Sequence, residues 1–148
     1  MNGIEASSKL KEIFPSAIFI DTVIFSLTKF NENYSASQKG KFAHICIVSK
    51  EKDEMRQNSA ENFWFLLKSF GFDLRFSKSI ESDIWQKFIH KCAINSIKAR
   101  YLYKSGQLRK DEKCLKDLKS IYSERYNVAK ALWKSMPEDY VETKLLLQ

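Results

Sequence analysis

The stretch SIESDIWQKFIHKCAINSIKARY, residues 79–101, predicts one long helix that organises the C-terminal half of this chain. Ser79 or Ser82 is a suitable N-cap, and the acidic residues of the first turn favour the helix dipole. Apolar residues recur at helical spacing along one side: Trp85, Phe88, Ile89, Cys92, Ala93 and Ile97. Polar and cationic residues three or four apart mark another side: Lys87, Lys91, Asn95 and Lys98. The pattern therefore predicts a helix with a buried side and a cationic side.

The cationic side has two interpretations. A lysine and an asparagine two turns apart can offer an ammonium group and an amide to one small anionic ligand. The same spacing also occurs on the solvated lysine face of an ordinary core helix. Spacing alone favours the solvated face.

Length and composition indicate a globular protein. The chain has 148 residues, of which 44% are hydrophobic and 14% aromatic, with four glycines and two prolines. This is enough for one domain, or for parts of two. The net charge of +7 is compatible with an anionic partner, but the lysines are spread along the chain, so charge alone identifies none.

The cysteines and histidines indicate neither disulfides nor a metal site. Cys46, Cys92 and Cys114 are widely spaced and odd in number, and no Cys-x-x-Cys pair occurs. His44 and His90 do not complete a metal-ligand spacing. The sequence therefore predicts free thiols in a reducing cytosol and no metal.

No stretch predicts a membrane segment. The N-terminus lacks the charged and then apolar pattern of a signal peptide. The longest apolar run, near residues 17–27, is interrupted by Asp21 and Thr22. We therefore expect a soluble cytoplasmic chain with no membrane partner.

The N-terminal part predicts a short helix followed by two strands. Residues 2–14 read as a turn and helix that Pro15 ends. The β-branched and aromatic run 17–30 predicts a strand, the polar stretch 31–40 a turn, and 42–48 a second strand. The second strand is apolar on both faces, so we expect packing on each side of it.

Helices dominate the remainder. Asn58, with Glu61 three residues later, predicts the start of a helix that Gly71 ends. Alternation over 72–76 predicts a short strand before the helix at 79–101. A last long helix is predicted over 111–133. The fold class is therefore α+β, with the helices gathered towards the C-terminus.

The long helix resembles the signature helix of ketopantoate reductases (2-dehydropantoate 2-reductases), which reduce ketopantoate with NADPH on the way to pantothenate. The resemblance rests on Trp85, Lys87, Cys92-Ala93-Ile94-Asn95 and Ala99. Further stretches resemble the family in the same order and cover most of residues 2–132: Asn2-Gly3-Ile4, 9–15, 66–72 and 77–80. The resemblance implies a partial α/β organisation in two parts. Residues 1–76 would be the end of a Rossmann-like cofactor domain, and residues 77–148 the first helices of a helical substrate domain.

The resemblance also implies site residues. Lys87 matches the lysine that is the family's proposed proton donor. Asn95 matches an asparagine that contacts the substrate, and Ser105 falls where another substrate-binding asparagine is expected. Asn2 matches an asparagine between nicotinamide and substrate. These matches imply NADP as cofactor and a small 2-keto acid as substrate.

Departures from the family pattern argue against full activity. Lys91 stands where a second asparagine is frequent, and Ser96 replaces a proline. No Gly-x-Gly-x-x-Gly motif occurs, so the glycines that let a backbone approach a pyrophosphate are missing. The family's late helices have no counterpart. We therefore expect a fragment of an NADP-dependent oxidoreductase with little or no activity alone.

Two other functions remain open. In the first, the chain is one subunit of a split reductase, and a separate Rossmann chain supplies the cofactor site. Self-association of the chain is a related possibility. The second strand, 42–48, would then offer an unpaired edge. A basic helical module that binds nucleic acid or a protein partner is the other alternative. Nucleic acid is the least favoured partner, because no recognised motif for it occurs.

Overall fold

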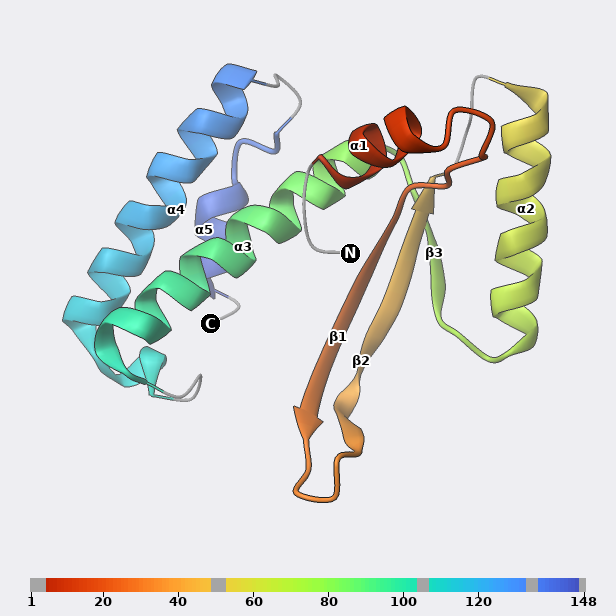
Figure 1. Cartoon of the computed structure of the whole chain (residues 1–148). Helices are drawn as coiled ribbons and strands as arrows, with labels where there is room; N and C mark the ends of the chain where they lie inside the picture. Colours follow the sequence, from red (N-terminus) through yellow and green to blue (C-terminus); the bar gives the residue numbers. More distant parts are fainter. Residues whose placement is uncertain (1–4, 49–52, 104–106, 133–135, 147–148) are drawn as a thin grey trace. The chain divides into compact units, whose positions relative to one another are not determined.

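The computed structural model describes residues 5–48, 53–103, 107–132 and 136–146 (Figure 1). The helices are α1 (Ala6–Ile13), α2 (Glu54–Ser69), α3 (Ile80–Tyr101), the 3₁₀ turn η1 (Leu108–Lys110), α4 (Glu112–Leu132) and α5 (Tyr140–Leu146). The strands are β1 (Thr22–Phe30), β2 (Ala36–Val48) and β3 (Leu74–Ser77). The chain forms two compact units that divide within α3, between Ile84 and Trp85. The predicted α+β fold class is confirmed.

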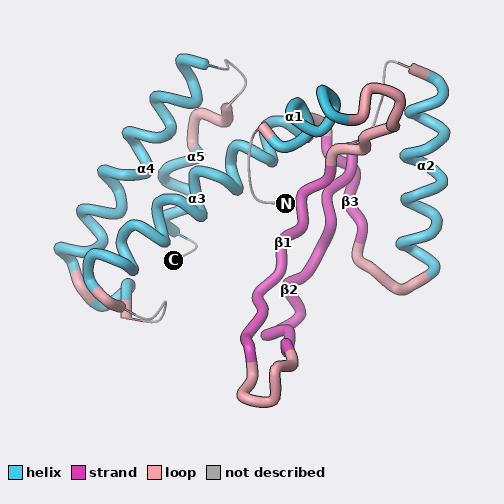
Figure 2. Tube along the Cα trace, in the orientation of Figure 1, coloured by secondary structure: helices cyan, strands magenta, loops and turns pink. Residues whose placement is uncertain are grey.

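The first unit contains a three-stranded mixed sheet in the order β1-β2-β3 (Figure 2). β1 pairs antiparallel with β2, and β2 pairs parallel with β3. The unpaired edge predicted for the second strand is wrong, because Ile45, Cys46 and Ile47 pair with β1 on one side and with β3 on the other. β2 is therefore the central strand.

Both faces of β2 are covered where its side chains are described. His44, Ile45, Cys46 and Ile47 are all buried. Since neighbouring strand residues point to opposite faces, this confirms packing on both sides. On one face Cys46 packs in a cluster with Val23, Ile80, Phe25 and Ile84, so the start of α3 covers that side of the sheet.

The hairpin between β1 and β2 differs from the expected boundaries. β1 begins at Thr22 instead of residue 17, and β2 begins at Ala36 instead of residue 42. The polar turn therefore shrinks to Asn31–Ser35, in which Tyr34 has a left-handed φ of 59°. The sequence missed the extra strand residues because they are largely polar, and backbone pairing such as that of Thr28 with Gln38 forms the ladder there.

α2 begins earlier than predicted. Asp53 is its N-cap, and its carboxylate accepts a hydrogen bond from the Met55 backbone N–H at 2.9 Å. The predicted cap at Asn58 is wrong, because Asn58 lies inside the helix. The predicted end at Gly71 is confirmed: its φ is +80°, and its N–H donates to the carbonyl of Lys68.

The second unit is helical, with one apolar core. α3 contributes three fully buried residues from the predicted apolar side, Ile89, Ala93 and Ile97. α4 and α5 complete this core with Cys114, Leu118, Tyr122, Ala129, Tyr140 and Val141. In the part of the chain that the structure describes, no helix is long and apolar enough to cross a membrane.

Candidate functional site on α3

Lys87 stands in the second turn of α3 and is half-buried. Burial lowers the pKa of its ammonium group, and the positive charge of Lys91 lowers that pKa further. Both effects favour the neutral amine, since burial and a nearby like charge each penalise the charged form. Lys91 itself is exposed, one turn further along the same side. The surroundings of Lys87 therefore make its ammonium group a better proton donor than a solvent-exposed lysine.

Asn95 is exposed and lies on the same side of α3 as Lys87. Their separation of eight positions corresponds to about 12 Å along the helix axis at 1.5 Å per residue. Lys91 lies midway between the two. α3 therefore aligns Lys87, Lys91 and Asn95 in one row, and a ligand that contacts both ends of the row must span two turns or rely on the reach of the lysine side chains.

His90 lies in the same segment of α3 but belongs to the core. A 2.6 Å hydrogen bond joins its Nδ1 to the buried Tyr122 hydroxyl on α4, and the two rings stack with centroids 6.1 Å apart. Burial, followed by the charges of Lys144 and Lys91, lowers the pKa of His90 to about 4. His90 is therefore neutral near pH 7 and fixes α3 against α4.

Tyr140 attaches α5 to the turn of α3 that carries Lys87. Its hydroxyl donates a 2.6 Å hydrogen bond to the backbone carbonyl of Gln86, the residue before Lys87. Burial raises the pKa of both Tyr140 and Tyr122, so both phenols stay protonated. α5 lies beyond the last helix predicted from the sequence, residues 111–133. The signal available there was the apolar pair formed by Tyr140 and Val141, which are both buried.

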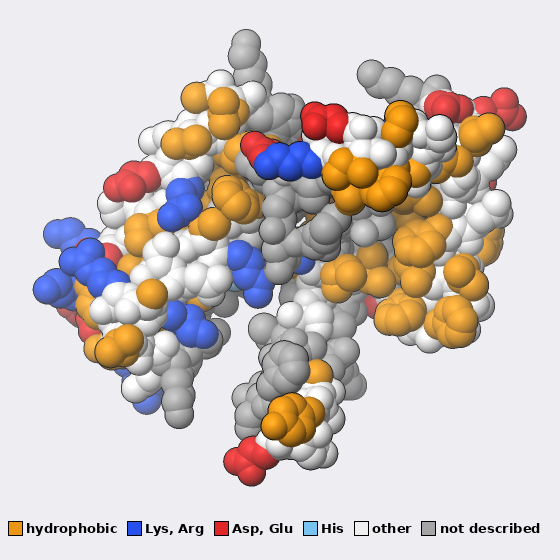
Figure 3. All heavy atoms as spheres, viewed as in Figure 1, with side chains coloured by type: hydrophobic (Ala, Val, Ile, Leu, Met, Phe, Trp, Pro, Cys, Tyr) orange, Lys and Arg blue, Asp and Glu red, His pale blue; other side chains and the backbone are white. Residues whose placement is uncertain are grey.

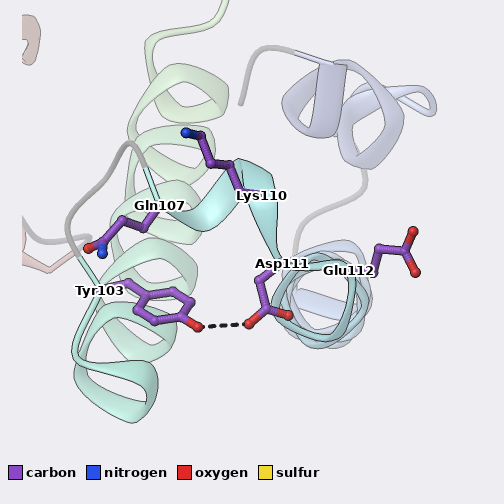
Figure 4. Close-up of a pocket in the computed structure, with 5 residues that line it drawn as sticks. All are labelled: Tyr103, Gln107, Lys110, Asp111 and Glu112. Carbon is purple, nitrogen blue, oxygen red and sulfur yellow. Dashed lines mark hydrogen bonds between the residues drawn. The ribbon is translucent and has the colours of Figure 1, made fainter.

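An open hollow lies at the other end of the helical unit (Figure 4). It has a volume of about 490 Å³ and is lined by Tyr103, Gln107, Lys110, Asp111 and Glu112. The Tyr103 hydroxyl donates to the Asp111 carboxylate at 2.9 Å, and this carboxylate also accepts from the Cys114 N–H at 3.1 Å. These bonds lower the pKa of the Asp111 carboxyl group. The bond from the Cys114 N–H makes Asp111 the N-cap of α4. Neither Lys87 nor Asn95 lines this hollow.

The other two predicted site residues, Asn2 and Ser105, lie outside the described residues. The three cysteines are free thiols. Within residues 5–48, 53–103, 107–132 and 136–146, no group of three His, Cys, Asp or Glu side chains is placed to hold a metal ion.

The described N-terminal ends of α2 and α3 do not fit the pyrophosphate of NADP. A dinucleotide site places a glycine-rich turn and a helix N-terminus against the phosphates. The described stretch 78–79 between β3 and α3 contains no glycine, and in the sequence none precedes Asp53 between β2 and α2. Both helices also begin with acidic residues: Asp53 and Glu54 in α2, and Glu81 and Asp83 in α3. Negative charge at these positions disfavours a bound phosphate.

Comparison by sequence finds no relative, since no protein-family model matches the chain and no curated protein matches it. The solved structures that match include two 2-dehydropantoate 2-reductases. The enzyme from Porphyromonas gingivalis W83 matches with a TM-score of 0.78 and 15% identity, over 99% of this chain and 49% of that one. The enzyme from Methylococcus capsulatus matches with a TM-score of 0.70 and 19% identity, over 98% of this chain and 46% of that one.

The chain has the fold of part of a ketopantoate reductase. It spans about half the length of each of these two reductases. The resemblance inferred from the signature helix is thus confirmed for the fold. The roles of Lys87 and Asn95 stay predictions.

Proposed function

We propose that this chain is a 2-dehydropantoate 2-reductase-like protein that supplies part of the 2-keto-acid site of a reductase in pantothenate biosynthesis. The observation that carries the proposal is the half-buried Lys87, whose pKa is lowered by burial and by Lys91, on a helix of the reductase fold. In this proposal residues 1–76 belong to the cofactor domain and residues 77–148 to the substrate domain. Free thiols agree with a cytoplasmic location.

Lys87 would act as the proton donor at the keto oxygen. A general acid works best when its pKa lies near the working pH, and burial moves a lysine in that direction. The charge of Lys91, one turn away, would attract the substrate carboxylate and further favour proton release from Lys87. Asn95 would bind the polar groups of the substrate through its amide, and Ser105 and Asn2 would contribute from the substrate and cofactor sides.

NADPH would supply the hydride in such a reductase. The N-terminal ends of α2 and α3 do not fit its pyrophosphate, so we assign no pyrophosphate-binding step to this chain. The chain alone is then expected to have little or no NADPH-dependent activity. In the complete enzyme the remaining half of the reductase fold would bind the cofactor.

Titration of the isotope-labelled chain with ketopantoate, followed by NMR, tests the keto-acid site. We expect amide shifts concentrated around Lys87, Lys91 and Asn95, and their loss in Lys87→Ala. Lys116→Ala is the matched control, since Lys116 is an exposed lysine of α4, and it should leave the titration unchanged. Equal shifts in both variants would contradict the role of Lys87.

A second arm measures NADPH oxidation by the chain alone in the presence of ketopantoate. We expect no oxidation above the rate without protein. Sustained turnover by the purified chain would contradict the assignment of cofactor binding to the remaining half of the fold.

A further inference from the structure

The outward side of α2 carries large apolar side chains that solvent reaches. Met55, Phe65 and Leu66 are 65%, 63% and 53% exposed, and Phe70, the C-cap, is 72% exposed. Single apolar residues on a surface are normal, but these four recur at helical spacing and form one stripe, which we call the α2 stripe. Figure 3 shows hydrophobic side chains gathered over α2, at the right of the view.

The opposite side of α2 is the one that packs within its own unit. Trp64 stacks on Phe76 of β3 with ring centroids 5.3 Å apart, and Ala60 is buried. A helix that covers a sheet with one side normally keeps its outward side polar. Packing within this unit therefore does not explain the α2 stripe.

The polar residues within the α2 stripe can be covered at little cost. The Ser59 hydroxyl donates to the Met55 carbonyl at 2.8 Å, and the Ser69 hydroxyl donates to the Leu66 carbonyl at 2.7 Å. Both serines are thus bonded within their own helix, so covering them leaves no hydroxyl proton without an acceptor. Asn62 is exposed midway along the stripe, and its amide can both donate and accept. An identical amide opposite would therefore satisfy it.

The exposed apolar area of the α2 stripe is suited to an interface between proteins. A large apolar side chain can bury ~150–250 Å², so four that are half to three-quarters exposed present roughly 400–600 Å². One partner of a standard interface contributes about 800 Å², of which about 56–65% is apolar, or ~450–500 Å². The α2 stripe alone therefore supplies about the apolar area that a stable dimer needs.

Charged residues along one border of the stripe indicate which partner fits. Glu54, Glu61 and Lys68 are exposed and spaced seven residues apart, so they lie in one line beside the stripe. In a parallel pair of identical helices each of these charges would face itself, which is repulsive. In an antiparallel pair related by a two-fold axis near Glu61, Lys68 of one copy faces Glu54 of the other, and symmetry forms this pair twice. Glu61 faces itself in both arrangements, so the two ends of the border favour the antiparallel one.

We infer that this chain forms a homodimer through α2, in which the α2 stripe packs antiparallel against the same stripe of a second copy. Asn62 then lies near the two-fold axis, where the two side-chain amides can bond to each other. The inference does not depend on the proposed function, because α2 and Lys87 lie in different units of the chain.

Light scattering after size exclusion, over a concentration series of the purified full chain, tests the dimer. We expect the mass to approach twice the 17.3 kDa of one chain. Leu66→Glu should raise the dissociation constant of the dimer at least ~100-fold, because a symmetric interface buries the new charge twice. Leu132→Glu is the matched control: Leu132 is exposed at the end of α4, in the other unit, and its dimer should form as before. Circular dichroism checks the folding of both variants, and Phe65→Glu replaces Leu66→Glu if the latter unfolds.

A charge exchange tests the antiparallel arrangement. Glu54→Lys alone should raise the dissociation constant about 3- to 10-fold, because both pairs with Lys68 become repulsive. Adding Lys68→Glu restores opposite charges, so the double variant should dimerise nearly as well as the unaltered chain. Both substitutions oppose the helix dipole, so a more stable helix cannot be the source of this rescue.

Three results would overturn the inference. The first is a chain that stays monomeric at every concentration, including one in which Leu66→Glu weakens only the binding of a different protein. The second is a dimer that Leu66→Glu leaves as intact as Leu132→Glu does. The third is a dimer in which Lys68→Glu fails to rescue Glu54→Lys, because only the antiparallel arrangement brings these two positions together.

Discussion

Acidification between pH 6.5 and 4 should destabilise this protein through His90. The pKa of this histidine falls from 6.5 to about 4 in the folded chain, first because of burial and then because of Lys144 and Lys91. The unfolded chain therefore binds a proton in this pH range that the folded chain does not bind. Because stability rises with pH wherever the unfolded state binds more protons, it must fall as the pH drops through this range.

The magnitude follows from the two pKa values. Each unit of difference corresponds to about 1.4 kcal/mol, so His90 should remove about 2.5 kcal/mol of stability by pH 4.5 and about 3 kcal/mol by pH 4. Above pH 7 both states are neutral at this position and the effect vanishes. His44, the other histidine, also has a pKa lowered by burial and should add to the loss.

Urea denaturation at pH 7.5 and pH 4.5, followed by circular dichroism at 222 nm, measures the effect. His90→Asn is the informative variant, because its amide can replace Nδ1 as the hydrogen-bond partner of Tyr122 but does not titrate. In this variant the difference between the free energies of unfolding at pH 7.5 and at pH 4.5 should be smaller by about 2.5 kcal/mol. The double variant that also carries His44→Asn should lose most of the remaining difference in stability between the two pH values.

An unchanged pH dependence in His90→Asn would refute the reasoning. It would mean that His90 is protonated in the folded chain over this range. A direct NMR titration of the imidazole that gave a pKa near 6.5 would lead to the same conclusion.

Three further substitutions test the packing and the helix ends by urea denaturation. Ile97→Ala should cost about 2–5 kcal/mol, because it removes methyl groups from a fully buried site, whereas Val128→Ala on the exposed side of α4 should cost less than about 0.5 kcal/mol. Gly71→Ala should cost about 1–2 kcal/mol through the left-handed backbone alone, because an added Cβ meets nothing within 4 Å. Asp53→Ala should lower the free energy of unfolding by about 1 kcal/mol, because it removes the cap of α2. A variant as stable as the unaltered chain would contradict the assigned start of this helix.

Periodicity predicted the long helices well. The apolar side of α3 was assigned from spacing, and the structure buries Ile89, Ala93 and Ile97 completely. Such a pattern is strong because it repeats over six turns of one helix. Gly71 was equally informative, because only glycine adopts its backbone conformation without strain.

Boundaries and the pairing of strands could not be derived in the same way. Asn58 and Glu61 matched a capping pattern, but Asp53 had already started the helix. The central place of β2 depends on its parallel pairing with β3 across α2, which is a long-range contact without a local signal. Polar hairpin residues likewise join strands through backbone hydrogen bonds, which side-chain patterns do not record.

The candidate site was predicted in part. Lys87 and Asn95 do lie on one side of α3, and helical spacing was enough to place them there. The lowered pKa of Lys87 required knowledge of its burial, which follows from packing. The contact between Tyr140 and the Gln86 carbonyl joins residues 54 positions apart, so no local pattern could reveal it.

NADPH oxidation with ketopantoate, measured for the chain mixed with the remaining half of the Porphyromonas gingivalis reductase, tests the central claim most directly. The account predicts turnover by the mixture and none by the chain alone. It also predicts a loss of ~10²-fold or more in Lys87→Ala, the usual worth of a general acid. A mixture in which Lys87→Ala turns over as fast as the unaltered chain would contradict it, and so would a mixture that stays inactive.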